Sequence, residues 1–212
     1  MRNRTRHTAL WILFSTLLLG LITATALAEN LLPPQQAIQN VSSQLQQKMK
    51  DKSFTHNFAQ VVQFVNGVID PYTDFTQIAQ LVLGQHWRTA SPEEQQRFKQ
   101  EFKTLLVRTY SRAFVEYTDW SMRFRPIQMP KAATRVMVRT DILQPGRQAV
   151  EVNYRMLLRR GDWKVYDIMI GGVSLVTNYR TTFNDEIQRK GLNVVIDELA
   201  KRNAEALSGR NS

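Results

Sequence analysis

The run 120–170, in which apolar and polar side chains alternate with a period of two, is the strongest constraint on the fold. Such alternation is typical of β-strands that have one face on a core and one face in solvent. The alternating stretches are 120–125, 135–142, 149–159 and 163–170. Two turn signals, Pro145-Gly146 and Arg160-Gly161-Asp162, separate the last three stretches. The run therefore predicts a four-stranded antiparallel sheet with one apolar face and one polar, basic face.

The last of these stretches leads through Gly171-Gly172 into a different pattern. From Val173 onward the apolar residues have helical spacing, and we expect this helix to extend to Lys190. A helix that follows a strand through two glycines can fold back over the sheet that contains the strand.

Helical patterns elsewhere in the chain predict the layer that covers the sheet. Ser91-Pro92-Glu93-Glu94 is a capping box with proline at the first helical position, so we expect a long helix over 92–119. Shorter helices are predicted over 33–49, 54–65 and 70–83, and after Asn193, which we expect to act as an N-cap. Residues 85–90 are expected to form a loop. The predicted fold class is α+β, with helices wrapped over a curved four-stranded antiparallel sheet.

Residues 1–28 have the layout of a secretory signal peptide. Three arginines precede an apolar stretch from Ala9 to Leu21, and Ala26-Leu27-Ala28 matches an A-x-A cleavage site. An uncleaved membrane anchor is the alternative, because the apolar stretch is nearly long enough to span a bilayer. The small-residue site favours cleavage. We therefore expect a mature chain that begins at Glu29 and forms a single domain over 29–212.

An exported chain without cysteine has no disulfides and must be held together by its core, which fits the bacterial periplasm. The net charge is +10, from 28 Lys and Arg against 18 Asp and Glu. Such a charge suggests nucleic acid as a partner, but the export signal argues against it. The sequence instead favours an anionic membrane surface or an acidic protein partner. A soluble surface of mixed charge, without a specific partner, is the alternative.

Residues with catalytic chemistry are sparse. His56 and His86 are the histidines that remain after cleavage, and no metal-ligand spacing, phosphate loop or nucleophile elbow occurs. We predict no metal and no cofactor. Alternation places Asp167 on the same strand face as Trp163 and Met169. Asp167 would be either a general base in a cavity or a structural acid that pairs with an arginine or caps backbone N–H groups. We favour the structural role because no second acid or base accompanies it.

Apolar stripes on the helix 92–119, on the sheet and on the helix 173–190 are expected to converge. Composition alone does not distinguish a solid core from a cavity for an apolar ligand. In a cavity, methionines such as Met122, Met156 and Met169 would supply an adaptable lining.

Three blocks of the sequence are similar to those of one protein family. They are LGQHWRTASPEEQQRF at 83–98, WKVYD at 163–167 with GVSL at 172–175 and YRTTF at 179–183, and KGLN at 190–193 followed by Leu199. Together they resemble the MlaC family, also called the toluene-tolerance auxiliary component, over essentially the whole mature chain. Gly171 stands where that family has an acid, and Asn193 stands where Asp is usual.

The resemblance implies a fold related to nuclear transport factor 2 and a periplasmic phospholipid carrier rather than an enzyme. The implied partners are a diacyl phospholipid, an inner-membrane ABC transporter complex and an outer-membrane lipoprotein–porin complex. Together they would keep the lipids of the outer membrane asymmetric. The acyl chains would lie in an apolar cavity while the head group stays in water. Each buried methylene is worth about 0.8 kcal/mol, so the chains would hold the lipid.

We predict the lipid-contacting residues from the inward stripes: Leu105, Leu106, Val138, Val152, Tyr154, Met156, Met169, Val173 and Val176. Val173 is expected near one end of the cavity, so Val173→Glu should abolish function, whereas Asp167→Asn should leave lipid carriage largely intact. Two alternatives remain open. One is a small periplasmic cavity enzyme with Asp167 as general base, and the other is a binding or adaptor module with a solid core.

Overall fold

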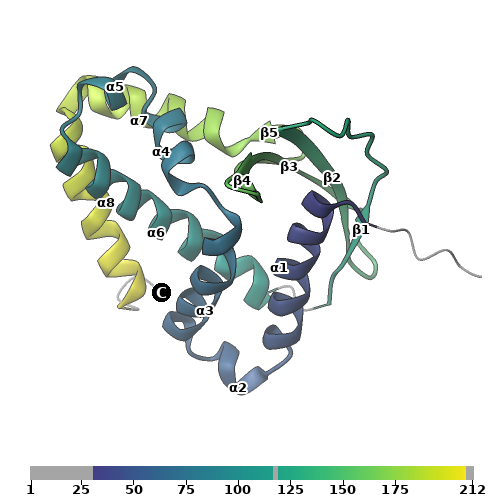
Figure 1. The fold of residues 1–212 in the computed structure, drawn as a ribbon. Helices are drawn as coiled ribbons and strands as arrows, with labels where there is room; N and C mark the ends of the chain where they lie inside the picture. The colour runs from purple at the N-terminus through teal and green to yellow at the C-terminus, as the bar shows by residue number, and fades with distance from the viewer. Residues whose placement is uncertain (1–30, 117–118, 209–212) are drawn as a thin grey trace, which may run out of the picture. The chain divides into compact units, whose positions relative to one another are not determined.

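The computed structural model describes residues 31–116 and 119–208 (Figure 1), so the predicted signal peptide lies outside the described residues. The described chain contains both helices and one antiparallel sheet. The strands are β1 Ser121–Phe124, β2 Arg135–Leu143, β3 Val150–Arg159, β4 Asp162–Ile170 and β5 Val173–Ser174. Each strand pairs with the next one in the chain. The predicted meander is thus present with a fifth strand added. The relation to nuclear transport factor 2 stays a prediction.

The fifth strand corrects the predicted start of the helix that follows the sheet. Gly171 and Gly172 have positive φ angles of 56° and 84°, which glycine adopts without steric penalty. They form a tight turn that returns Val173 and Ser174 along β4. Helix α7, Leu175–Lys190, therefore begins two residues later than predicted, and the Ser174 side chain caps it.

A β-bulge interrupts the pairing of β3 with β4. Met156 lies opposite Val165, but the preceding residue, Arg155, lies opposite Asp167. Tyr166 is therefore an extra residue in β4. Because side chains alternate between the two faces of a sheet, one extra residue exchanges the faces of everything beyond it.

This bulge overturns one prediction about β4. Asp167 and Met169 do not share the face of Trp163, because they follow the extra residue. Ile168 and Ile170 lie on that face instead. We call the face that carries Trp163, Ile168 and Ile170 the inner face, and the opposite one the outer face.

The helices are α1 Pro33–Met49, α2 Lys52–Thr55, α3 Phe58–Ile69, the 3-10 helix η1 Asp70–Tyr72, α4 Phe75–Leu83, α5 Gln85–Thr89, α6 Pro92–Glu116, α7 and α8 Leu192–Leu207. The predicted capping box at the start of α6 is confirmed. The Ser91 hydroxyl accepts from the backbone N–H of Glu94 at 3.1 Å, and the Ser91 N–H donates to the Glu94 carboxylate at 2.7 Å. Two acidic residues in the first turn also match the helix dipole.

Four helix predictions need correction. The helix predicted over 70–83 is divided into η1 and α4, because the side chain of Asp74 accepts from the N–H of Gln77 and starts a new helix. The helix predicted over 54–65 is divided into α2 and α3, because the side chain of Asn57 accepts from the N–H of Gln60 and starts a new helix. The loop predicted over 85–90 contains α5, which follows Gly84 at a positive φ of 55°. Asn193 does not cap α8. It lies inside the helix and donates to the Glu94 side chain at 2.7 Å.

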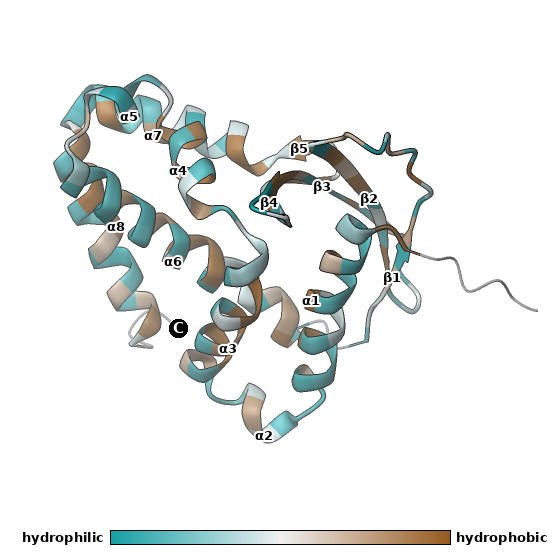
Figure 2. Ribbon diagram, viewed as in Figure 1, coloured by the Kyte–Doolittle hydropathy of each residue, from teal (hydrophilic) through white to brown (hydrophobic). Residues whose placement is uncertain are grey.

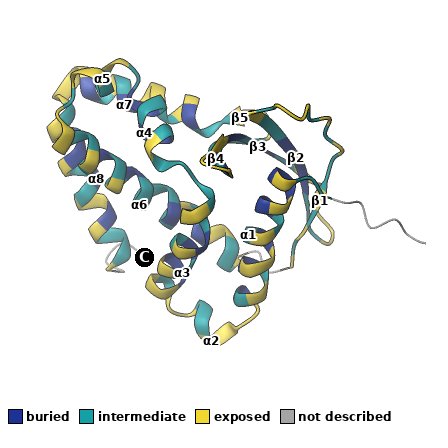
Figure 3. Cartoon of the chain, viewed as in Figure 1, coloured by how far each residue is buried: buried dark blue, intermediate teal, exposed yellow. Residues whose placement is uncertain are grey.

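Each longer helix packs through one apolar side. In Figure 2 the helices carry both hydrophilic and hydrophobic residues, as amphipathic packing requires. In Figure 3 buried residues recur along α6, α7 and α8, whereas all residues of α2 and α5 are exposed or half-buried. The apolar sides meet in three clusters that surround the interior of the protein.

The first cluster joins α4, α6, α7 and α8 through an aromatic group that includes Phe98, Phe102 and Phe183. The second joins α1, α3 and α6 around Val61 and other apolar residues. In the third, α1 packs on the inner face of the sheet through Ala37 and Ile38, against Val138, Met156, Trp163 and Val165.

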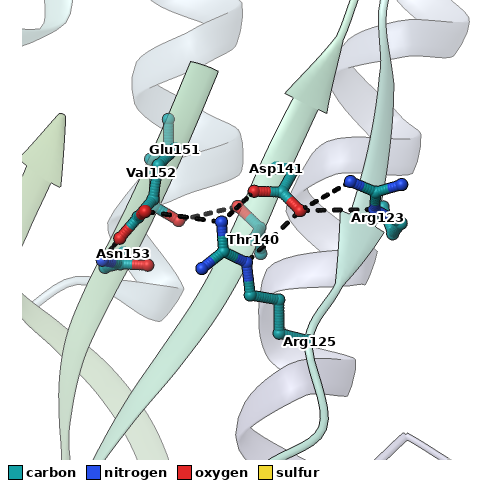
Figure 4. Close-up of polar contacts among 7 residues, drawn as sticks. All are labelled: Arg123, Arg125, Thr140, Asp141, Glu151, Val152 and Asn153. Carbon is teal, nitrogen blue, oxygen red and sulfur yellow. Dashed lines mark hydrogen bonds and ion pairs between the residues drawn. The ribbon is translucent and has the colours of Figure 1, made fainter. Parts of the chain in front are cut away.

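The outer face carries charged side chains, as predicted. Asp141 is only 5 % exposed and accepts from Arg123 at 3.0 Å and from Arg125 at 2.5 Å. Figure 4 shows Arg125 between the carboxylates of Asp141 and Glu151. Hydrogen bonds from Arg125 and Arg123 lower the pKa of Asp141, so its carboxylate stays ionised.

Candidate functional site: an apolar cavity between sheet and helices

An apolar cavity of about 330 Å³ lies between the inner face of the sheet and the helices. Helices α1, α3, α4, α6 and α7 contribute to its walls, and so do strands β1 to β4. Most lining side chains are aliphatic or aromatic. Among the described residues that line the cavity, Asp167 is the one with a charge. The site therefore suits an apolar ligand whose charged part stays outside.

Four of the nine predicted residues line this cavity. Leu106 reaches it from α6, Val152 and Tyr154 from β3, and Val176 from α7. The predicted convergence of α6, the sheet and α7 is therefore present in the structure. The contact of these residues with a lipid stays a prediction.

Val138 and Met156 do lie on the inner face, but neither lines the cavity. Both are fully buried and pack against Ala37 and Ile38 of α1. Helix α1 therefore fills the space above this part of the sheet, and the cavity lies beside the covered region.

The remaining three predicted residues point elsewhere. Leu105 packs against the cluster that joins α4, α6, α7 and α8. Met169 lies on the outer face because of the bulge. Val173 is 60 % exposed in β5 and is not among the residues that line the cavity. The turn at Gly171-Gly172 carries Val173 to the edge of the sheet.

Several lining residues were not predicted. Ile38, Val41 and Leu45 come from α1, and Val65 and Ile69 come from α3. The spacing of Val41, Leu45 and Val65 indicates the apolar sides of helices. Nothing in that spacing distinguishes a side chain against another helix from a side chain against a void.

The Asp167 carboxylate binds three neighbouring groups of the protein. Asp167 is 3 % exposed and accepts from the Ser174 hydroxyl at 2.7 Å and from the backbone N–H of Val176 at 3.1 Å. Arg155 pairs with the same carboxylate at 3.4 Å. Asp167 therefore caps the first turn of α7 and pairs with an arginine. The contacts of the predicted structural role are thus confirmed.

Four tyrosines line the cavity: Tyr72, Tyr110, Tyr154 and Tyr179. The pKa values of the last three are raised. Burial, together with the neighbouring hydroxyl of Tyr179 to which it hydrogen-bonds, raises the pKa of Tyr110 to about 12. Burial also raises the pKa of Tyr179 and brings that of Tyr154 to about 12. Thr140 hydrogen-bonds to Tyr154. All three phenols are neutral at physiological pH, so they add no charge to the wall.

Within residues 31–116 and 119–208, no group of three or more His, Asp or Glu side chains is placed to hold a metal ion. His86 lies 3.1 Å from the Asn184 side chain in a packing contact, and His56 is exposed. Over the same described residues, no helix has the length and apolar character needed to cross a bilayer.

In comparison with known proteins, the chain is similar to members of one family. A family model described as MlaC protein matches residues 39–201. The toluene tolerance protein ttg2D of Pseudomonas putida is 26 % identical over 178 residues, which cover 82 % of each chain. The intermembrane phospholipid transport system binding protein MlaC of Haemophilus influenzae is 23 % identical over 184 residues, which cover 84 % of this chain and 85 % of the relative.

One solved structure has a similar fold. It is a phospholipid-binding protein from Ralstonia solanacearum in complex with a phospholipid, with a TM-score of 0.76 and 30 % sequence identity. The match covers 82 % of this chain and 99 % of that protein.

Proposed function

The chain belongs to the MlaC family, and from this premise we propose that it is a periplasmic phospholipid carrier whose cavity holds the acyl chains of a diacyl phospholipid. The observation that carries the proposal is the cavity of about 330 Å³, which has an almost entirely uncharged lining. The phospholipid bound to the similar Ralstonia solanacearum protein supports the same ligand class here.

Burial of the chains would supply the binding energy. Each methylene moved from water into the cavity contributes about 0.8 kcal/mol, whereas a hydrogen bond contributes about 1 kcal/mol net. A chain of many methylenes therefore outweighs the contacts of the head group. Spontaneous release of such a ligand is slow, so a partner that opens the cavity would be needed at each end of the transport route.

We propose that these partners are an inner-membrane ABC transporter complex and an outer-membrane lipoprotein–porin complex, and that the route keeps outer-membrane lipids asymmetric. The relative in Haemophilus influenzae is named for an intermembrane phospholipid transport system, which supports this assignment. Exposed arginines on the outer face, such as Arg135 and Arg139, suit docking to an acidic partner surface.

Lipid analysis of the purified protein tests the carrier function. Protein prepared from the periplasm without detergent should yield about one diacyl phospholipid per chain on organic extraction, because chain burial retains the lipid through purification. Native mass spectrometry should show the same complex intact. A lipid-free extract from correctly folded protein would overturn the proposal.

A further inference from the structure

Two buried polar groups at the cavity wall have no hydrogen-bond partner among the described residues. They are the hydroxyl of Ser42, a residue that is 3 % exposed, and the indole Nε1 of Trp120. Both residues line the cavity. Buried polar groups in folded proteins are nearly always hydrogen-bonded, so each of these groups calls for an explanation.

The two groups belong to the same part of the cavity wall. Gln46 lies one turn after Ser42 in α1, and its side chain donates to the backbone carbonyl of Trp120 at 2.9 Å. Residues four apart lie on the same side of a helix. The Trp120 ring also packs near Phe114 of α6, with the ring centres 6.1 Å apart. Trp120 thus lies where α1, α6 and the start of β1 come together, and Ser42 lies one helical turn from the residue of α1 that contacts it.

This part of the cavity lies close to solvent. Ala113 lines the cavity and is exposed, and so is Asp119, which directly precedes Trp120. A polar group of the ligand held here would lie near the opening, with the apolar chains further inside and the charged head group outside.

The unpartnered polar groups of the cavity wall indicate which kind of hydrogen-bond acceptor a ligand would offer them. An indole N–H is only a donor, and a serine hydroxyl can donate as well. No lysine or arginine is among the described residues of the lining, whereas the acidic Asp167 is one of them. A phosphate anion would be poorly stabilised there, whereas a neutral carbonyl oxygen matches two uncharged donors.

We propose that the Trp120 indole N–H and the Ser42 hydroxyl bind the ester carbonyl oxygens at the heads of the acyl chains. The cavity then distinguishes ester-linked phospholipids from ether-linked ones of equal chain length, because an ether lacks the carbonyl acceptor. This inference rests on the proposed carrier function and adds the linkage chemistry of the ligand.

A competition between two lipids tests the inference. The delipidated protein is loaded from an equimolar mixture of a diacyl phosphatidylcholine and its dialkyl ether analogue with the same chain lengths. Native mass spectrometry then gives the ratio of the two complexes. We expect the ester lipid in excess by about fivefold for each net hydrogen bond that the carbonyl oxygens accept. Trp120→Phe and Ser42→Ala should each lower this ratio, and the double variant should bring it close to one.

Two variants serve as matched controls. Ser111 is a buried serine whose hydroxyl also lacks a partner among the described residues, but it does not line the cavity. Trp163 is a buried tryptophan that packs under α1. Ser111→Ala and Trp163→Phe should keep the ratio of the original protein.

The outcomes separate the inference from the function on which it rests. Equal loading of the two lipids by the original protein overturns the inference and leaves the carrier function intact. A high ratio that survives in the Ser42 and Trp120 double variant also overturns it. Failure to load either lipid contradicts the carrier function itself.

Discussion

Asp167 ties the last long strand of the sheet to the helix that follows it. Its carboxylate contacts the Ser174 hydroxyl, the Val176 N–H and the Arg155 guanidinium. The sequence predicted this kind of structural role, because a lone acid without a second titratable neighbour is a poor catalyst. It did not predict the partners, since the bulge decides which face Asp167 occupies.

We expect Asp167→Asn to destabilise the protein by about 1–3 kcal/mol, because an amide cannot replace all the hydrogen bonds that the carboxylate accepts. Lipid content per folded chain should remain that of the original protein. Denaturant unfolding and lipid extraction measure the two quantities. Asp197→Asn is the control, because Asp197 forms an exposed ion pair whose loss should change stability little. Unchanged stability with lost lipid would instead assign Asp167 a direct role in binding.

Val173 and Val176 allow a comparison between an exposed valine and a valine that lines the cavity. The exposed Val173 should tolerate a carboxylate, so Val173→Glu should change stability by no more than about 0.5 kcal/mol and keep its lipid. This reverses the expectation from sequence. Val176 is 7 % exposed and lines the cavity, so Val176→Glu places a charge among apolar side chains and should remove most of the lipid. The amount of lipid per folded chain and the melting temperature of each variant show which of the two valines lines the cavity.

At the scale of elements, β4 illustrates what alternation can and cannot predict. The pattern identified the strand from its aromatic and β-branched residues. The extra residue, Tyr166, sits in a stretch whose local sequence is compatible with a regular strand, so only the pairing with β3 reveals the bulge. Helix α5 and strand β5 were missed for a related reason. Each is short and is fixed by a neighbouring glycine with positive φ rather than by a periodic pattern.

The bulge can be tested by chemical labelling. The chain has no cysteine, so Ile168→Cys and Met169→Cys each introduce a single thiol. Ile168 lines the cavity, and its thiol should react with a maleimide more slowly when lipid is bound. Met169 lies on the outer face, and its thiol should react at one rate in loaded and empty protein. Protection of position 169 in place of 168 would show that β4 has no bulge.

At the scale of the whole molecule, the fold class followed from the order of patterns: helices, then strands, then helices. The cavity did not follow, because a void depends on how far α1 and α6 stand from the sheet. Side-chain periodicity carries no information about that distance. The same limit explains why the apolar spacing of residues such as Leu45 and Val65 does not identify them as cavity lining.

Export is the remaining expectation at this scale. The A-x-A site predicts a periplasmic protein that begins at Glu29 and folds as a single domain. N-terminal sequencing of the protein recovered from the periplasm should therefore start with Glu29-Asn30-Leu31. Recovery of the full chain from the membrane fraction would show that the apolar stretch is retained as an anchor.

Five α-helices, the 3-10 helix η1 and four strands contribute to the cavity wall, so its contents touch nearly every layer of the protein. A bound lipid would then complete the interior, and the empty form would be the less stable one. Proteases act on unfolded chains, and small losses of stability change protein abundance several-fold. The cell would thus degrade idle carriers faster than loaded ones, and the amount of carrier would follow the supply of cargo without a dedicated regulator.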